Sequence, residues 1–250
     1  MLTPTPEQDA ALARQLAQEA GDLLMALRAS GDYADKALGD AGDRAANAHI
    51  LQLLRSERSE DGLLSEEEKD NLARLGKARV WIIDPLDGTR EYREGRSDWA
   101  VHIGLSINGR AALGAVALPA RGLVLDTETV ASPAPSGDRP RLLVSRSRPP
   151  AMALAVAEAL GGTLIEMGSA GAKAMAVVLG EADIYLHSGG QYEWDNCAPI
   201  AVAEAAGLHV SRADGSPLVY NNENPWLPDL LICQKKWAAR VLAEVARQPT

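Results

Sequence analysis

Hydrophobic residues near the N-terminus recur at helical spacing. Over residues 6–30, leucines are spaced among polar and alanine residues in a way that predicts an amphipathic helix. Apolar residues at 50–54 predict a second helix over about 43–56. The Gly- and Asp-rich stretch between these helices is predicted to be a loop.

The middle of the chain has the patterns of β-strands. The apolar run Val80–Ile83 is typical of a strand buried on both faces, and it ends at Asp84-Pro85. Alternating apolar residues over 101–107, the turn Asn108-Gly109 and a second apolar segment over 113–118 predict a hairpin. This part of the chain is therefore predicted to form a mostly antiparallel sheet.

The second half of the chain alternates between predicted strands and predicted helices, which is typical of an α/β unit. The predicted strands are 142–144, 184–186 and 230–233, and the predicted helices are 150–160, 170–179, 195–206 and a last one from 235. A Pro-, Ser- and Gly-rich stretch at 131–140 precedes this half. We therefore divide the chain into an N-terminal lobe, residues 1–138, and a C-terminal lobe, residues 139–250.

Composition and charge narrow the class of protein. The chain has 250 residues, and its hydrophobic content of 46% is enough for a sizeable core. A net charge of −9 argues against binding to a nucleic-acid polymer. The chain has neither a signal-peptide pattern nor a membrane-spanning run, and its two cysteines are too few for a disulfide framework. We expect a cytoplasmic protein without a membrane partner.

The candidate chemistry begins where the buried strand ends. Asp84 and Asp87 lie three positions apart, and both can point into one crevice. Because Gly88 lets the backbone approach a ligand, the Leu86 carbonyl could join these carboxylates as a hard oxygen ligand. Oxygen ligands at this density suit Mg2+. Taken alone, the segment could equally be a turn in which both aspartates bond only to the backbone.

Two further acidic segments are weaker signals when each is taken alone. Glu66 begins a run of three glutamates after Leu63-Leu64, and such a run is typical of a solvated helix start. Asp195 precedes an Ala-rich helix, where an N-cap aspartate is common. The four histidines lack metal-binding spacing, and we assign no role to them: His49, His102, His187 and His209.

Together, these segments resemble the signature of the inositol monophosphatase superfamily. That family has a Glu-Glu element, then Asp-Pro-x-Asp-Gly-Thr, and later Trp-Asp-x-Ala-Ala. This chain has Glu66-Glu67, Asp84–Thr89 and Trp194–Ala198 in the same order. The family's Gly-Ser-Ala-Ala element is similar to Gly168–Lys173, and the resemblance covers nearly the whole chain.

The resemblance implies a fold and a metal centre. The implied fold is an α/β layered αβαβα sandwich of the inositol monophosphatase and fructose-1,6-bisphosphatase type. The implied cofactor is Mg2+, with up to three ions. The implied ligands are Glu66, Asp84, the Leu86 carbonyl, Asp87 and Asp195. Without cations, carboxylates held this close would repel one another and their pKa values would rise.

The same resemblance implies catalytic roles. Glu66 and Thr89 would orient the attacking water, and Asp43 would lie near it as an acid–base participant. The amides of Gly88 and Thr89 would bind the phosphate at a helix start. The segment Leu38–Asp43 departs from the family pattern Asp-x-Val-Thr-x-Ala-Asp, so the role of Asp43 rests on less of the signature.

Three features resemble the bisphosphate nucleotidase branch of this superfamily. Thr89 is followed by Arg90-Glu91-Tyr92, similar to the Lys-Glu-Phe of that branch. Ser145–Arg148 is similar to the Ser-x-Ser-His of that branch, with Arg148 at the histidine position. Lys173 stands where inositol phosphatases usually have Asp or Asn.

A nucleotide with phosphates at both 3' and 5' needs a cationic contact for the phosphate that the metal ions do not hold. Arg148 and Lys173 are the candidates for this contact. The other phosphate is implied to contact Leu86, Asp87, Gly88, Thr89 and Asp195. The alternative interpretation of Arg148 is an exposed surface charge.

The resemblance thus implies a Mg2+-dependent phosphatase that removes the 3'-phosphate of adenosine 3',5'-bisphosphate and of its sulfonated precursor. Such an enzyme would serve sulfur assimilation and nucleotide recycling, would be inhibited by lithium, and would be compatible with a homodimer. The nearest alternative is a phosphatase of inositol 1-phosphate or fructose 1,6-bisphosphate. A non-catalytic phosphate-binding module is a third hypothesis, but such a module would be expected to lack a metal carboxylate, and all are present.

Overall fold

The computed structural model describes residues 4–248 and places two five-stranded sheets in that part of the chain. The first sheet has the order β1-β2-β3-β4-β5 and the second the order β7-β6-β8-β10-β9. The strands of the first sheet are β1 (Gly62–Ser65), β2 (Arg79–Asp87), β3 (Ala100–Ile107), β4 (Arg110–Leu118) and β5 (Leu123–Asp126). Those of the second are β6 (Arg141–Ser145), β7 (Thr163–Met167), β8 (Ile184–Tyr192), β9 (His209–Ser211) and β10 (Trp226–Cys233).

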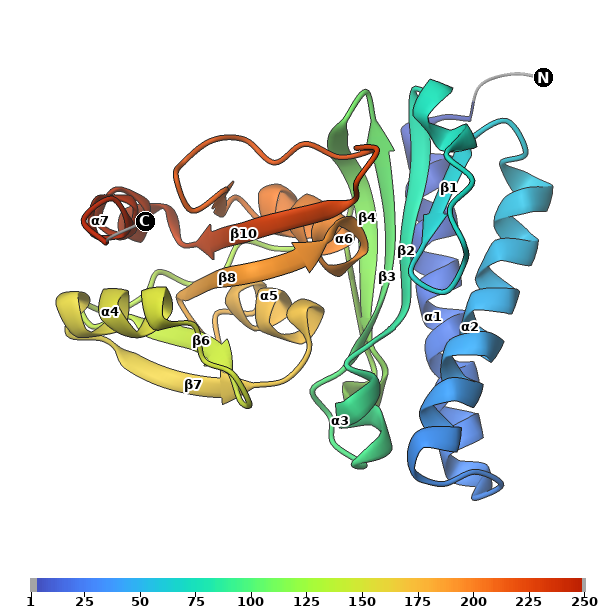
Figure 1. Ribbon diagram of the computed structural model, residues 1–250, viewed down its shortest axis with the longest axis horizontal. Helices are drawn as coiled ribbons and strands as arrows, with labels where there is room; N and C mark the ends of the chain where they lie inside the picture. The colour runs from blue at the N-terminus through green and yellow to red at the C-terminus, as the bar shows by residue number, and fades with distance from the viewer. Residues whose placement is uncertain (1–3, 249–250) are drawn as a thin grey trace.

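Helices form three layers around and between these sheets. Their bounds are α1 (Pro6–Ser30), α2 (Asp35–Glu57), α3 (Thr89–Arg93), α4 (Ala151–Leu160), α5 (Ala170–Val178), α6 (Glu193–Ala205) and α7 (Lys235–Val245). Two short 3-10 helices are η1 (Ala73–Gly76) and η2 (Pro119–Arg121). Helices α1 and α2 cover the first sheet, α5 and α6 lie between the sheets, and α4 and α7 cover the second (Figure 1). This arrangement confirms the predicted αβαβα sandwich.

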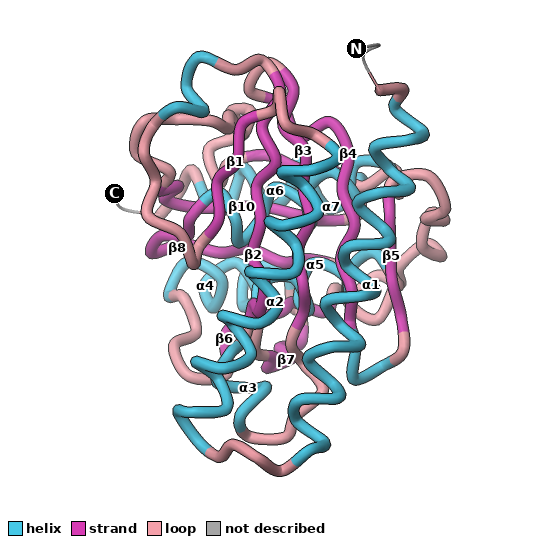
Figure 2. Tube along the Cα trace, turned by 90° about the vertical axis from the view of Figure 1, so that its right-hand side faces the viewer, coloured by secondary structure: helices cyan, strands magenta, loops and turns pink. Residues whose placement is uncertain are grey.

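The first helix forms where the sequence predicts it. A capping box between Thr5 and Gln8 satisfies amides at its start, and Gly31 ends it with a φ of 73°. Its buried side includes Leu16 and Leu24, which join the core against the first sheet. Figure 2 shows α1 and α2 lying along the outer face of that sheet.

The predicted bounds of the second helix are wrong at its start. It begins at Asp35, so most of the predicted Gly- and Asp-rich loop is helical. Gly39 and Gly42 share one helical face and allow close packing, because a Cβ at Gly39 would lie 2.7 Å from Thr89 Cγ2. A Cβ at Gly42 would lie 3.1 Å from Leu86 Cδ2. The glycines therefore bring α2 against the end of β2 and the start of α3, instead of forming a turn.

Four strands were not predicted, and all of them are short. β1, β5, β7 and β9 contain between three and five residues each, and each lies at a sheet edge or ends a sheet order. β5, β7 and β9 are only partly buried, and β1 has only four residues, so none of the four carries a long hydrophobic pattern. β1 runs parallel to β2 and pairs Leu64 with Ile82.

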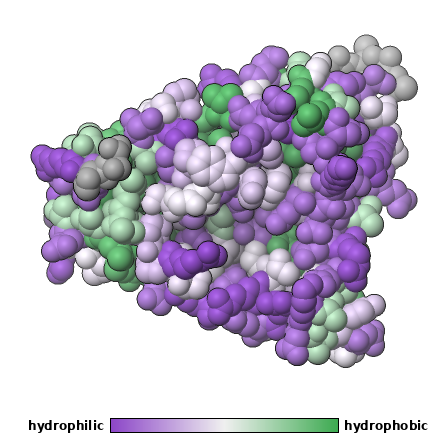
Figure 3. All heavy atoms as spheres, viewed as in Figure 1, coloured by the Kyte–Doolittle hydropathy of each residue, from purple (hydrophilic) through white to green (hydrophobic). Residues whose placement is uncertain are grey.

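The two predicted lobes share a core. Residue 138 falls between the two sheets, but Val116 of the first sheet and Ile232 of the second belong to one buried cluster around α5 and α6. The division at 138 therefore stays a prediction. None of the helices within residues 4–248 combines the length and apolar character needed to cross a membrane. The face shown in Figure 3 is mostly hydrophilic, with apolar residues gathered over α4 and α7.

Candidate metal centre

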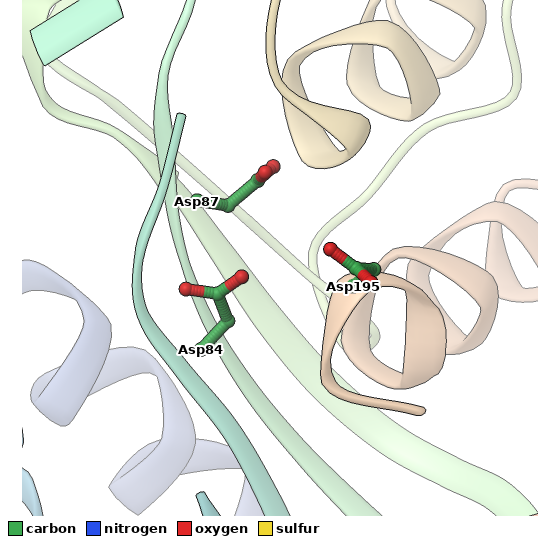
Figure 4. Close-up of side chains that lie close together, drawn as sticks. All are labelled: Asp84, Asp87 and Asp195. Carbon is green, nitrogen blue, oxygen red and sulfur yellow. The ribbon is translucent and has the colours of Figure 1, made fainter. Parts of the chain in front are cut away.

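Three carboxylates converge where β2 ends and α6 begins. Asp84 and Asp87 come from β2 and Asp195 from the first turn of α6, and each offers an oxygen within 4.8 Å of the others. Figure 4 shows the three side chains turned toward a common space. Residues three apart on a regular strand point to opposite faces. The pairing of β2 with β3 is irregular between Asp84 and Asp87, which lets both reach the same space.

Asp84 has a strongly perturbed pKa. It is buried, and its Oδ1 accepts a hydrogen bond from the Leu86 amide at 3.0 Å. Burial, followed by the negative charges of Glu66 and Asp87, raises its pKa well above the usual value. The metal-free protein therefore supplies too little positive charge to stabilise the ionised carboxylate of Asp84.

Asp87 is instead held as an anion by the start of α5. It accepts hydrogen bonds from the Ser169 hydroxyl at 2.5 Å, the Gly171 amide at 2.6 Å and the Ala170 amide at 3.2 Å. Burial would raise the pKa of Asp87, but His102 and these donors outweigh it and lower the pKa to about 2. Ser169 adopts a φ of 50°, which is rare for a residue with a side chain.

Glu66 and Asp195 complete the acidic surroundings. The Glu66 amide bonds to the Ile83 carbonyl at 3.2 Å, which extends the pairing of β1 with β2 and sets Glu66 beside the cluster. Although the residue is partly in solvent, its carboxyl group loses hydration in the crevice, and repulsion from Asp195 adds to this, raising its pKa to about 7. Burial and repulsion from Asp87 raise the pKa of Asp195 to about 6.

This donor set fits divalent cations. Carboxylates with raised pKa values in a shared crevice are stabilised when a cation offsets their repulsion. Oxygen-only ligands suit Mg2+ or Ca2+ better than softer metals. Asp195 also accepts a hydrogen bond from the Tyr192 amide at 2.6 Å, so it caps α6 while its other oxygen remains available.

The predicted catalytic residues lie together beside this cluster. The Thr89 hydroxyl donates to the Leu86 carbonyl at 3.1 Å. Burial and the negative charges of Glu67 and Asp40 raise the pKa of Asp43 to about 7, while a hydrogen bond with Thr89 opposes this shift. Asp43, on α2, is thus next to Thr89 despite the divergent sequence around it.

The predicted phosphate contacts are placed differently from one another. Gly88 precedes α3 with a φ of 88°, and a Cβ there would lie 3.0 Å from Ser169 Cβ. Lys173 is buried, and its ammonium donates to the carbonyls of Gly168 at 3.1 Å and Ser169 at 2.5 Å. Arg148 is exposed. The roles of Arg148 and Lys173 in binding a second phosphate stay predictions, and the contacts of Lys173 are with the protein backbone.

Sequence reasoning missed His102. This histidine is fully buried on β3, with Nε2 3.3 Å from Asp87 Oδ2 and Nδ1 3.0 Å from the Trp194 carbonyl. Burial disfavours the charged ring, but Asp87 more than offsets this and raises the pKa of His102. What places His102 at the site is the register of β2 with β3, in which His102 pairs with Asp84.

The fold and the carboxylate cluster are those of a metal-dependent family of phosphatases, and the chain belongs to it: residues 5–250 match the inositol monophosphatase family. The 3'-phosphoadenosine 5'-phosphate phosphatase of Mycobacterium tuberculosis is 52% identical over 239 residues, covering 91% of this chain and 90% of that protein. The 3'(2'),5'-bisphosphate nucleotidase CysQ of Escherichia coli K12 is 31% identical over 231 residues, covering 85% and 94%.

A solved structure agrees with these sequence matches. The crystal structure of CysQ from Bacteroides thetaiotaomicron, a bacterial member of the same family, superposes with a TM-score of 0.78. It is 26% identical and covers 90% of this chain and 97% of its own. The resemblance inferred from the sequence motifs is therefore confirmed, together with the fold that it implied.

Proposed function

We propose that this protein is a Mg2+-dependent phosphatase that hydrolyses the 3'-phosphate of adenosine 3',5'-bisphosphate and of its 5'-phosphosulfate form. The observation that carries the proposal is the convergence of Asp84, Asp87 and Asp195 at the end of β2 and the start of α6. The substrate is supported by the names of the mycobacterial relatives, which are 50–52% identical. A nucleotide role also suits a chain whose net charge of −9 disfavours binding to a nucleic-acid polymer.

The residues that would hold Mg2+ are Glu66, Asp84, Asp87, Asp195 and the Leu86 carbonyl. When bound, the ions supply positive charge that neutralises the phosphate and acidifies a water molecule. The number of ions, up to three, is part of the proposal.

Thr89 and Glu66 would orient the attacking water, and Asp43 would act as its acid–base partner. The Thr89 hydroxyl is oriented by the Leu86 carbonyl, and Asp43 lies beside it. The pKa of Asp43, raised to about 7, is near the range in which a carboxylate serves as a general base at neutral pH. Gly88 and Thr89 would present their amides to the phosphate, and Arg148 would contact the second phosphate.

A comparison of substrates tests the proposal. The purified protein with Mg2+ is assayed for phosphate release from adenosine 3',5'-bisphosphate, inositol 1-phosphate and fructose 1,6-bisphosphate. We expect the highest kcat/KM for the nucleotide, adenosine 5'-phosphate as its product, and loss of activity with a chelator. Lithium inhibition, which the family resemblance implies, is measured in the same assay. A higher kcat/KM for either sugar phosphate would replace the proposed substrate, and release of the 5'-phosphate would contradict the proposed regiochemistry.

A further inference from the structure

His102 connects the two segments that carry the metal-centre aspartates. Its Nε2 faces Asp87 at the end of β2, and its Nδ1 faces the carbonyl of Trp194, the residue before Asp195. We infer that His102 is a positioning residue that sets the spacing between Asp87 and Asp195, and thereby the affinity of the centre for divalent metal. This inference rests on the proposed metal-dependent function.

The surroundings fix the imidazole ring in one place. His102 and Gly104 share the face of β3 that meets α5 and α6, where a Cβ at Gly104 would lie 2.9 Å from the Ala198 amide. Gly171 of α5 leaves the space that the ring occupies, because a Cβ there would overlap His102 Nε2. The ring is fully buried between these elements, so it has little room for another position.

The contacts of Asp87 show what the ring adds. The hydrogen-bond donors to its carboxylate, from Ser169, Ala170 and Gly171, all belong to the start of α5. Within residues 4–248, His102 links Asp87 to the start of α6, with Nε2 on the Asp87 side and Nδ1 on the Trp194 side. Apart from its approach to Asp87, His102 Nε2 has no hydrogen-bond partner in that part of the chain, so Asp87 is the group that it can serve.

An apolar side chain of similar size could fill the same space, but it would leave both contacts unmade. The Trp194 carbonyl would lose its contact with the ring, and the start of α6 could shift relative to Asp87. Changes in such outer contacts of metal ligands typically cost about tenfold to a hundredfold in metal affinity. Replacements of His102 that keep one contact and lose the other can therefore separate positioning from packing.

Two amides offer that separation. In His102→Gln, the side-chain amide nitrogen takes roughly the place of Nε2 and can reach Asp87. In His102→Asn, it takes roughly the place of Nδ1 and can reach the Trp194 carbonyl only. His209→Asn is the matched control, since the His209 ring contacts the Ser211 hydroxyl on β9.

The experiment measures Mn2+ binding to the metal-free proteins by calorimetry, with kcat and KM for adenosine 3',5'-bisphosphate measured alongside. We expect His102→Asn to weaken Mn2+ binding by about tenfold to a hundredfold. His102→Gln, which loses the contact with the Trp194 carbonyl, should weaken Mn2+ binding as well, and His209→Asn should leave it unchanged. Circular dichroism establishes that each variant is folded.

The outcomes are distinct. Wild-type Mn2+ affinity in folded His102→Asn would overturn the inference and leave the proposed function intact, whereas a wild-type protein that binds no Mn2+ would overturn both. If His102→Asn does not fold, Gly171→Ala pushes the ring aside while keeping the residue 171 amide. In a His102→Ala background, Gly171→Ala should then cause little further loss of Mn2+ affinity, because both changes act through one contact. Fully additive losses would overturn the inference.

Discussion

Replacing Asp87 by asparagine removes a charge that the folded protein stabilises even without metal. The pKa of Asp87 falls from the usual 3.8 to about 2. A shift of this size corresponds to about 2–3 kcal/mol in favour of the ionised carboxylate. The Ala170 and Gly171 amides donate to different oxygens of Asp87, so the single oxygen of asparagine can keep only one of these bonds, and asparagine carries no charge. We therefore expect Asp87→Asn to lose about 2 kcal/mol of folding free energy, or about 4–8 °C in Tm for a chain of this size.

The same variant should lose far more in catalysis than in stability. Because a ligand charge disappears from the centre, phosphate release with Mg2+ should fall by orders of magnitude. Thermal unfolding in a chelator gives the stability change, and steady-state phosphate release gives the activity. Asp126→Asn is the control, since Asp126 is also buried with a lowered pKa, but it holds the turn after β5 through Thr129 and Glu128. Near wild-type turnover in folded Asp87→Asn would refute the metal assignment.

Three further predictions concern pH, packing and specificity. The pKa values of Glu66 and Asp195 are raised to about 7 and 6, so the metal-free folded protein favours their protonated forms. The Tm measured in a chelator should therefore fall as pH rises from 5 to 8, and Mg2+ should reduce that fall. A Cβ at Gly114 would lie 2.9 Å from the α6 backbone, so Gly114→Ala should cost about 1–3 kcal/mol in urea unfolding, whereas Gly137→Ala, in open space, should be neutral. Arg148→Ala should lower kcat/KM about tenfold to a hundredfold for adenosine 3',5'-bisphosphate but not for inositol 1-phosphate; equal losses would exclude a role in reading the second phosphate.

Local sequence signals located Asp84 and Asp87 as candidate ligands, and the family resemblance decided between a metal site and a turn. The apolar run of β2 and the change to Asp84-Pro85 mark a buried strand and its end within a few residues, so no long-range information is needed. Asp195 could be assigned only because its surrounding motif matches the family. The fold class followed from the same resemblance, together with the change from antiparallel strands to alternating strands and helices.

The remaining features depend on contacts between distant segments. Gly39 and Gly42 suggest a turn when the sequence is read locally, but their function is to bring α2 against Thr89 and Leu86. The position of His102 beside Asp87 follows from the register of β2 with β3 and from the space at the start of α5. Neither the register nor that space can be derived from a single sequence.

The anchoring of Asp87 to α5 gives the centre built-in hydrogen-exchange reporters. The backbone amides of Ala170 and Gly171 donate to the Asp87 carboxylate, and both residues are buried. Their protons can exchange with solvent only when the first turn of α5 separates from the end of β2. A metal that binds the folded state suppresses such openings in proportion to its occupancy. The exchange rates of these two amides should therefore slow as Mg2+ is added, following the state of the site without any substrate present.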